Sequence, residues 1–454
     1  MRSSAGERRA SPQSLVMRLL LCSLTCVSVN ISAKALSAEN IHYTPFGSER
    51  AGNDDGSIPA WRNDKEFINK TYAKIHNETP LFEITASNYR DYAEYLSAGQ
   101  KALFAAYPNS FHMPIYASHR LQNVPDYVAN ATLKNQNDAV LIDDGNALDN
   151  VWPGIPFPRS ESALEILWNH ITAWRGRSFS SSYTEASVRP DESTTIIKSK
   201  LDFASPFHDP TRDKYTGTGK LFYFLARTYS PALLAGGATL VHETTQPRIS
   251  PRKTWIYVKG NKRVQRLPSL THDGPNMNSE HIRVIDEVNL FNGAPDRYNW
   301  KILAKKEHYI PYNNNLLAQR NKNINTILGN THIKPEITRY EKHRVWVIEG
   351  SLKETENHLY KKRIFYIDED TWLIILAEQY NHKNELWRTS SSYTKYYPEM
   401  PGTFTVLDSF HDLLTNNYYI QAITQQNKKA IEFFDTAIDN RQFMPSALSR
   451  GANR

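Results

Sequence analysis

The stretch from residue 344 to residue 397 constrains the fold of this chain more than any other. It contains successive apolar runs that are rich in Val, Ile, Trp, Phe and Tyr and bounded by Asp, Asn, Gly or Lys. This pattern is typical of β-strands joined by tight turns. The connections at residues 368–371 and 381–384 are shorter than the roughly twelve residues that a parallel crossover needs. Neighbouring strands are therefore expected to be antiparallel.

The strands of this meander are apolar on both faces. In residues 364–367 and 372–377, both sets of alternating side chains are apolar. An antiparallel sheet with one face in water would carry polar residues on that face. We therefore expect both faces to be covered by helices, by a second sheet or by a bound apolar ligand.

Helical periodicity is confined to the earlier part of the chain. Apolar residues recur at helical spacing in residues 85–107, 126–134 and 160–174. The passage at residues 152–158 is expected to be an extended loop, because its prolines lack backbone donors.

From residue 194 onward the apolar period changes to about 2 residues, which indicates strands. An insert at residues 269–341 has a mostly irregular pattern, and such a long loop is expected to be functional or to pack as a cover. The expected fold class is α+β, with one large curved antiparallel sheet wrapped around helices. The strands expected outside the meander are residues 194–203, 220–230, 237–245, 252–259, 263–267, 403–409 and 418–424.

The amino terminus has the pattern of a secretory signal peptide. A positive start is followed by a short apolar run and a small-residue exit, so cleavage is expected after Ala35 or Ala38. The apolar run is shorter than the roughly 18 residues that span a bilayer. The sequence leaves translation start open between Met1 and Met17.

These features set the expected domain organisation. Residues 1–38 are the signal peptide, and residues 39–454 form a single large β-rich domain. That domain has a helical and loop part at residues 39–190 and a strand meander at residues 191–425. Both cysteines of the chain lie in the signal peptide, so the mature protein has none. A large exported chain without disulfides is expected in the periplasm.

The charge of the chain does not favour a nucleic-acid partner. The first 38 residues hold five of the 54 basic residues and one of the 47 acidic residues, so their removal lowers the net charge from +7 to +3. No arginine-rich run follows the amino terminus. We therefore expect no binding of nucleic acid.

Catalytic and metal-binding motifs are missing from the sequence. There is no Gly-x-Ser-x-Gly elbow, and His242-Glu243 is not followed by the second histidine of a zinc motif. Neither Gly-rich phosphate motif occurs. We expect no catalytic residues, no metal and no cofactor, although scattered histidines and carboxylates leave an ester or glycan hydrolase as an alternative.

Five passages carry a resemblance to a known family. They are Gly52-Asn-Asp-Asp-Gly-Ser-Ile-Pro-Ala-Trp61, Tyr116-Ala-Ser-His-Arg120, Gly154-Ile-Pro-Phe-Pro158 with Trp168-Asn-His170, Phe291-Asn-Gly-Ala-Pro-Asp-Arg-Tyr-Asn-Trp300, and Arg344-Val-Trp through Tyr366-Ile-Asp-Glu-Asp-Thr-Trp372 to Leu386-Trp-Arg388. Together they resemble the bacterial family called domain of unknown function 1329, over nearly the whole mature chain.

The resemblance implies a fold and a function. The strand meander of this family is similar to that of periplasmic lipoprotein carriers and their outer-membrane receptors, in which a half-open barrel closes over helices around a cavity for acyl chains. The family has no established catalytic residues. The resemblance therefore implies a non-enzymatic carrier of a lipid or other hydrophobic molecule, with an inner-membrane exporter and an outer-membrane protein as partners.

The residues also support a binder, because a curled sheet with two apolar faces can leave an apolar cavity. A non-catalytic scaffold of an envelope complex is the other alternative to a carrier. A slip of one residue would exchange the two faces of a strand, so the lining is a prediction of position only. The residues expected to line the cavity are Phe222, Phe224, Trp255, Tyr257, Trp346, Phe365, Trp372 and Ile374.

Overall fold

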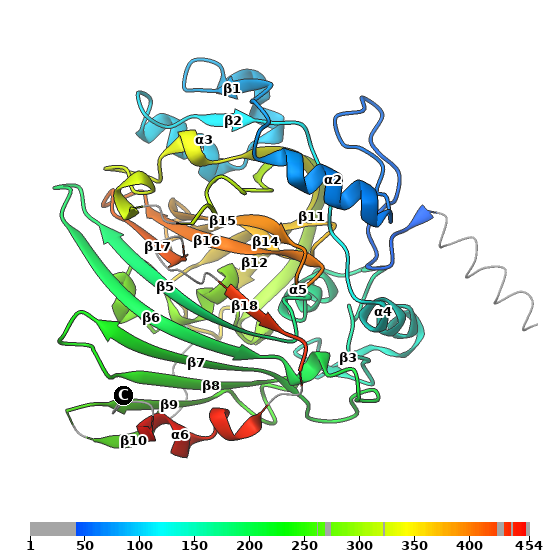
Figure 1. The fold of residues 1–454 in the computed structure, drawn as a ribbon, viewed down its shortest axis with the longest axis vertical. Helices are drawn as coiled ribbons and strands as arrows, with labels where there is room; N and C mark the ends of the chain where they lie inside the picture. The colour runs from blue at the N-terminus through cyan, green and yellow to red at the C-terminus, as the bar shows by residue number, and fades with distance from the viewer. Residues whose placement is uncertain are drawn as a thin grey trace, which may run out of the picture.

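The computed structural model describes residues 42–260, 262–267, 274–320, 323–424, 431–436 and 439–450. The expected signal peptide at residues 1–38 lies outside the described residues. Figure 1 shows a large curved sheet that forms most of the molecule, with short helices against it. The α-helices are α2 (Lys65–Ile75), α3 (Ala98–Ala106), α4 (Asp126–Asp138), α5 (Ala163–Ile171) and α6 (Pro445–Arg450).

The strands are distributed along the whole described chain. They are β1 (Phe82–Ile84), β2 (Met113–Ile115), β3 (Val140–Ile142), β4 (Ala147–Asp149), β5 (Ser178–Val188), β6 (Thr194–Ala204), β7 (Lys220–Ser230), β8 (Ala238–Thr244), β9 (Lys253–Val258), β10 (Arg263–Leu267), β11 (Tyr298–Pro311), β12 (Tyr340–Leu352), β13 (Lys362–Asp368), β14 (Ile374–Tyr380), β15 (Leu386–Tyr397), β16 (Gly402–Asp412), β17 (Tyr418–Ile423) and β18 (Ile431–Phe434).

Sixteen of these strands form one sheet in the order β1-β2-β12-β13-β14-β15-β16-β17-β5-β6-β7-β8-β9-β10, with β11 beside β12 and β18 beside β5. The pairing of β2 with β12 is parallel and the others are antiparallel. Within the described residues, β1 and β10 end the path without pairing to each other, so the sheet is not closed. The expected fold class, a large curved antiparallel sheet with helices, is confirmed.

The central meander is present as β12 to β15, but one strand begins later than its pattern predicts. Trp372 lies in the turn between β13 and β14 with a φ of 58°, and the turn is closed by its N–H, which donates to the Asp368 carbonyl at 2.9 Å. Its indole N–H donates to the Phe46 carbonyl at 2.8 Å. These tertiary hydrogen bonds place Trp372 outside the alternation that includes Ile374.

Two strands lie where the sequence does not indicate them. β5 falls in the part expected to be helical and loop, because its run of Ser and Thr has little apolar character. β11 falls in the insert expected to be mostly irregular, yet it pairs with β12 along nearly its whole length, with a bulge between Ile302 and Ala304. Hydrogen-bonded pairing with strands distant in sequence stabilises both segments as strands, although their own residue patterns do not indicate strands.

The meander is covered on both faces, as its apolar pattern requires. On one face lies α3, whose Gly99 N–H donates to Glu378 Oε1 on β14 at 2.9 Å. On the other face lies α5, whose Trp168 belongs to the same core as Phe365 of β13. The helix expected at residues 85–107 is divided, because Ser97 forms a capping box with Gln100 that starts α3 anew.

Candidate functional site

Two adjoining hollows lie between the inner face of the curved sheet and the segment at residues 275–292. Their volumes are about 130 and 330 Å³. We call them together the sheet cavity, since the same six residues line both. These residues are Tyr183, Glu185, Phe222, Phe224, Arg283 and Val288.

The register of β6 to β9 builds an apolar wall for the sheet cavity. Phe203 of β6 pairs with Phe224 of β7, which pairs with Val241 of β8. Directly paired residues point to the same face of a sheet, so these side chains form one row. A second row runs from Leu201 through Ala226 and Thr239 to Ile256.

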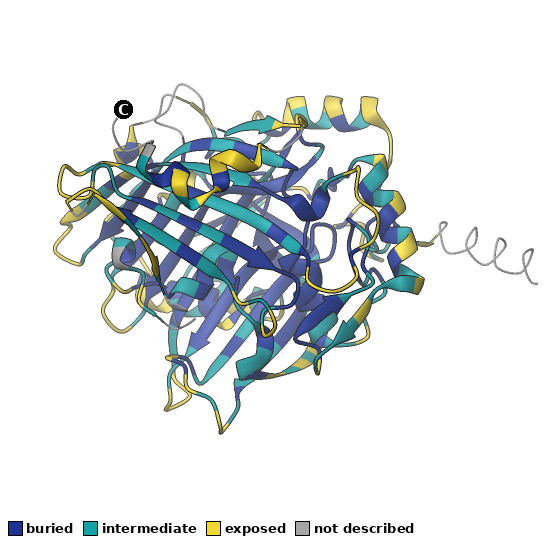
Figure 2. Cartoon of the chain, turned by 90° about the horizontal axis from the view of Figure 1, so that it is seen from below, coloured by how far each residue is buried: buried dark blue, intermediate teal, exposed yellow. Residues whose placement is uncertain are grey.

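The aromatic side chains of this wall are only partly covered by protein. Phe203, Phe222 and Phe224 are half-buried, although they point to the inside of the sheet. By contrast, β16 is buried at every position. Figure 2 shows the same difference between dark blue strands in the interior and teal strands at the side of the molecule. Half-covered aromatic rings that face inward are typical of a ligand-binding surface.

The cavity is polar where the strands β5, β16 and β17 meet the covering segment. Glu185 of β5 accepts hydrogen bonds from the Tyr419 hydroxyl and from Asn278 Nδ2. Asp408 of β16 accepts one from Gln421 Nε2 at 2.8 Å. Burial raises the pKa of Glu185 and of Asp408, whereas these hydrogen bonds and the charge of Arg283 lower both values less strongly.

Arg283 is the cation at the centre of this polar end. Only 5% of the residue is exposed. Its Nε and Nη1 atoms have no hydrogen-bond partner among the described residues, although the guanidinium lies 5.8 Å from the centroid of the Phe410 ring. A buried donor without a partner is costly, so an acceptor atom that reached this guanidinium would be stabilised by it.

A second arginine, Arg175, lines the smaller hollow, and two of its guanidinium nitrogens already donate to backbone carbonyls. Its guanidinium donates to the carbonyls of His170 and Ala173 at the carboxyl end of α5, at 2.8 and 3.2 Å. Burial lowers the pKa of Arg175 to about 10, and the charge of Asp408 opposes that shift.

The structure separates the residues that the sequence places in a cavity. Phe222 and Phe224 line the sheet cavity. Trp255 and Tyr257 lie on the opposite face of β9, in a cluster with Phe443, and so do not line it. The strand alternation is sound, but only the packing of α6 decides which face is inside.

The other predicted lining residues belong to the core around α5. Phe365, Trp372 and Ile374 are buried there, and Trp346 packs at its edge, with Lys305 Nζ 5.1 Å from the centroid of its ring. None of these four lines the sheet cavity. Whether any of the eight predicted residues contacts a ligand stays a prediction.

Sequence reasoning also missed residues that do line the cavity. Phe179, Tyr183 and Glu185 alternate along β5, and this period of two was the available signal. Arg283 lies in the irregular insert, where no local pattern distinguishes it from other charged residues.

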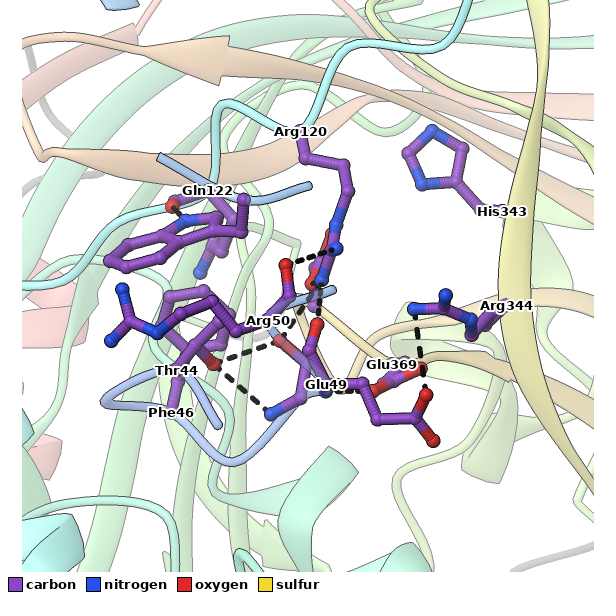
Figure 3. A network of polar contacts seen from close by, with 12 residues as sticks. Thr44, Phe46, Glu49, Arg50, Arg120, Gln122, His343, Arg344 and Glu369 are labelled. Atoms are coloured by element: carbon purple, nitrogen blue, oxygen red, sulfur yellow. Dashed lines mark hydrogen bonds and ion pairs between the residues drawn. The ribbon is translucent and has the colours of Figure 1, made fainter. Parts of the chain in front are cut away.

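A separate polar network joins distant parts of the chain (Figure 3). Arg120 donates from Nε and Nη2 to the two oxygens of Asp370, at 2.8 and 2.7 Å. It also donates to the Glu49 carbonyl at 2.6 Å, and Glu369 accepts from the Glu49 N–H. Arg120 and Asp370 are almost completely buried. The network therefore ties residues 44–50 to the turn between β13 and β14.

Histidine and carboxylate side chains do converge near this network. His343 Nε2 lies 3.2 Å from Glu341 Oε2, and its Nδ1 lies 3.9 Å from Asp368 Oδ1. All three are at most 1% exposed, and none lines the sheet cavity. Arg339 holds the pKa of Glu341 down at about 2, against the effect of burial. Their burial and pairing fit a structural role better than an exposed catalytic one.

The described part of the chain holds no cluster of three or more His, Cys, Asp or Glu residues arranged to bind a metal. In the same residues, no helix combines the length and the apolar character needed to cross a membrane. The site that the fold and geometry define is therefore an amphipathic cavity inside an open antiparallel sheet.

Comparison with known proteins places this chain in a family. The model of the family Protein of unknown function (DUF1329) matches residues 83–449. Uncharacterized protein PA3922 of Pseudomonas aeruginosa is 36% identical over 436 residues, which cover 93% of this chain and 94% of that protein. The chain belongs to the DUF1329 family, as its five passages indicate.

Solved structures resemble it more distantly. A putative outer membrane lipoprotein-sorting protein domain from Vibrio parahaemolyticus is 17% identical, with a TM-score of 0.44 over 63% of this chain and 98% of that one. A DUF1329 family protein from Desulfovibrio piger is 13% identical, with a TM-score of 0.39 over 60% and 92%. LolA superfamily protein NE2245 from Nitrosomonas europaea is also 13% identical, with a TM-score of 0.36 over 63% and 98%. These TM-scores are below 0.5, so any argument for function depends on the sheet cavity.

Proposed function

We propose that this protein is a periplasmic carrier of a lipid or other hydrophobic molecule. The observation that supports the proposal is the sheet cavity, in which half-buried Phe203, Phe222 and Phe224 form an inward-facing aromatic wall. The larger hollow, of about 330 Å³, falls within the roughly 300–1,000 Å³ of ligand pockets.

Burial of hydrocarbon against this wall supplies the binding energy. Each methylene contributes about 0.8 kcal/mol, so ten methylenes contribute about 8 kcal/mol before the cost of ordering the ligand. This function needs no bond-making step and hence no catalytic residue. The periplasmic location depends on the expected signal peptide, and transfer between an inner-membrane exporter and an outer-membrane protein depends on the family resemblance.

A neutral apolar fluorophore tests the proposal. We expect N-phenyl-1-naphthylamine to become fluorescent on binding to the mature protein. Ala226 faces the larger hollow, and Ala226→Trp would fill part of it. Loss of space for about two methylenes weakens binding by about tenfold.

The matched control is Ala232→Trp, because Ala232 is exposed in the β7–β8 connection. This variant should bind the fluorophore like the unaltered protein. The carrier proposal fails if the unaltered protein does not bind the fluorophore, or if both tryptophan variants bind it equally well while far-ultraviolet circular dichroism shows them folded.

A further inference from the structure

We propose that the carried molecule is an amphiphile with an acidic head group, a carboxylate or a phosphate, and that Arg283 binds that head group. The inference rests on the proposed carrier function and adds the chemical class of the ligand. It comes from the position of Arg283 at the polar end of a cavity whose sheet wall is mostly aromatic and aliphatic. Arg252, which lines the larger hollow, is paired with Glu243 at 2.6 Å.

Arg283 has donors to offer. Its Nε and Nη1 atoms lack hydrogen-bond partners in the described structure, and 95% of the residue is covered. A guanidinium matches two oxygens of a carboxylate or phosphate through a planar fork of N–H groups, and Nε and Nη1 each form such a fork with Nη2. Arg283 forms no ion pair within 4.0 Å among the described residues, although Glu185 and Asp408 lie near enough to sense its charge. A buried cation without a directly bonded counter-ion is unfavourable, so an anionic ligand would stabilise it.

The backbone of Arg283 is held firmly for this role. Its N–H donates to Ser279 Oγ at 3.0 Å, and its carbonyl accepts from the Asn276 N–H at 2.9 Å. The bridge between Pro275 and Val284 closes the same turn. The fixed main chain removes one source of the entropy that is lost when a ligand binds.

The neighbouring acids do not take up the free donors. Glu185 is engaged by Tyr419 and Asn278, and Asp408 by Gln421. Burial raises the pKa of both carboxyls, which reduces their negative charge and so their repulsion of an anion. Arg175, the other cation at this end, adds positive potential, and its Nη1 and Nη2 atoms bind backbone carbonyls, whereas its Nε has no partner among the described residues.

The orientation of the ligand follows from this geometry. The acidic head group lies at Arg283, and the hydrocarbon chain extends along the rows formed by β6 to β9. Phe203 stacks on Phe179 with ring centroids 4.9 Å apart and lies 5.6 Å from Phe222, so an aromatic surface begins near the polar end. A neutral ligand of the same length would contact the apolar wall in the same way but would leave the guanidinium of Arg283 without a partner.

The test compares a fluorescent fatty acid, cis-parinaric acid, with its methyl ester, which differs only in the charge of the head group. We expect the unaltered mature protein to bind the acid at least about tenfold more tightly, as charge-assisted hydrogen bonds require. Arg283→Met should reduce acid binding to the level of the ester and leave ester binding unchanged. Arg263→Met, at an exposed position of β10, is the matched control and should keep the preference.

The comparison of acid and ester binding to the unaltered protein tests the acidic head group even if Arg283→Met does not fold. Equal binding of acid and ester would overturn the acidic head group and leave the carrier proposal intact. Binding of neither probe would overturn both. Displacement of the acid by hexadecanoate or by hexadecyl phosphate supports the inference and tells a carboxylate from a phosphate, whereas displacement by hexadecanol alone contradicts it.

Discussion

A single residue, Arg120, joins three of the five passages that resemble the family. It is the last residue of the Tyr116–Arg120 passage, and it pairs with Asp370 of the meander passage. It also donates to the carbonyls of Ala51 and Pro59, within or beside the Gly52–Trp61 passage. A fourth passage joins nearby, because His170 Nδ1 accepts from the Ile374 N–H at 3.0 Å. The distinctive residues therefore hold the core together.

Replacement of Arg120 by methionine should be strongly destabilising. It would leave the carboxylate of Asp370 buried without its cation, which costs about 3–5 kcal/mol of unfolding free energy. Urea denaturation followed by tryptophan fluorescence measures this loss. Arg62→Met is the control, since Arg62 pairs with Asp64 in an exposed ion pair, and its unfolding midpoint should not change. Equal midpoints for the two variants would contradict the role of the network.

Glu369 should make stability depend on pH. Burial, and to a lesser extent the charge of Asp370, raise its pKa from 4.5 to about 7 against the opposing effects of Lys305 and the Glu49 N–H. Between about pH 4.5 and 7 the folded protein then holds a proton that the unfolded chain has lost, so stability falls as pH rises through this window. Urea denaturation of the unaltered protein and of Glu369→Gln measures the difference.

The unaltered protein should lose stability relative to Glu369→Gln as pH rises from about 4.5 to 7.5. Subtraction of the two curves removes the contribution of Asp368, whose pKa burial also raises, to about 6. Glu354→Gln, at an exposed position, is the control and should follow the unaltered protein. A constant difference between the unaltered protein and Glu369→Gln across the window would rule out the raised pKa.

At the scale of elements, α6 decides which face of the outer strands is core. Phe443, which precedes this helix, and Leu448 within it pack against Leu225 and Leu240. The same strands therefore bury one face under α6 and present the other to the sheet cavity. The packing of this short helix thus determines which face of β7 to β9 is buried in the core and which face lines the sheet cavity.

Truncation of Phe443 tests this role. Phe443 is 1% exposed and its ring stacks on Tyr223 with centroids 5.3 Å apart. Phe443→Ala should lower the free energy of unfolding by about 3–5 kcal/mol, the range of buried Phe to Ala changes. Met444→Ala, at a position that is 50% exposed, should cost no more than about 0.5 kcal/mol. Similar urea midpoints for the two variants would refute a structural role of the segment formed by Phe443 and α6.

At the scale of the whole molecule, one open sheet serves two purposes. Its β12 to β16 part is buried under α3 and α5 and forms a closed core. Its β5 to β9 part encloses the sheet cavity together with residues 275–292. The same continuous set of strands therefore provides both stability and a cavity.

The expected location of the whole molecule is also testable. After expression of residues 1–454 in a Gram-negative bacterium, we expect the protein in the osmotic-shock fraction. Its intact mass should correspond to a chain that begins at Leu36 or Glu39. The reason is the apolar run and small-residue exit of the signal peptide. Leu20→Arg combined with Leu24→Arg interrupts that run and should retain the full chain in the cytoplasm. Retention of the unaltered chain would contradict export.

Much of the fold could be predicted from the sequence because strand periodicity and turn residues are local. The strands β7 and β10 have the predicted bounds, and the meander connections are too short for anything but antiparallel pairing. β5 has only a weak period of two, at Phe179, Tyr183 and Glu185, because most of its other residues are Ser or Thr, and its pairing with β6 and β17 makes it a strand. Phe222 and Phe224 line the sheet cavity, whereas Trp255 and Tyr257 lie on the opposite face of β9.

The sequence by itself determined the antiparallel meander, the apolar character of both its faces and the family, since these depend on residue type and spacing along the chain. Only the tertiary structure decided where the cavity lies and which residues line it. The side of a strand that faces the cavity depends on what packs against the other side. Arg283 reaches the polar end of the cavity because an irregular segment folds back over strands distant in sequence, and no local pattern records such a contact.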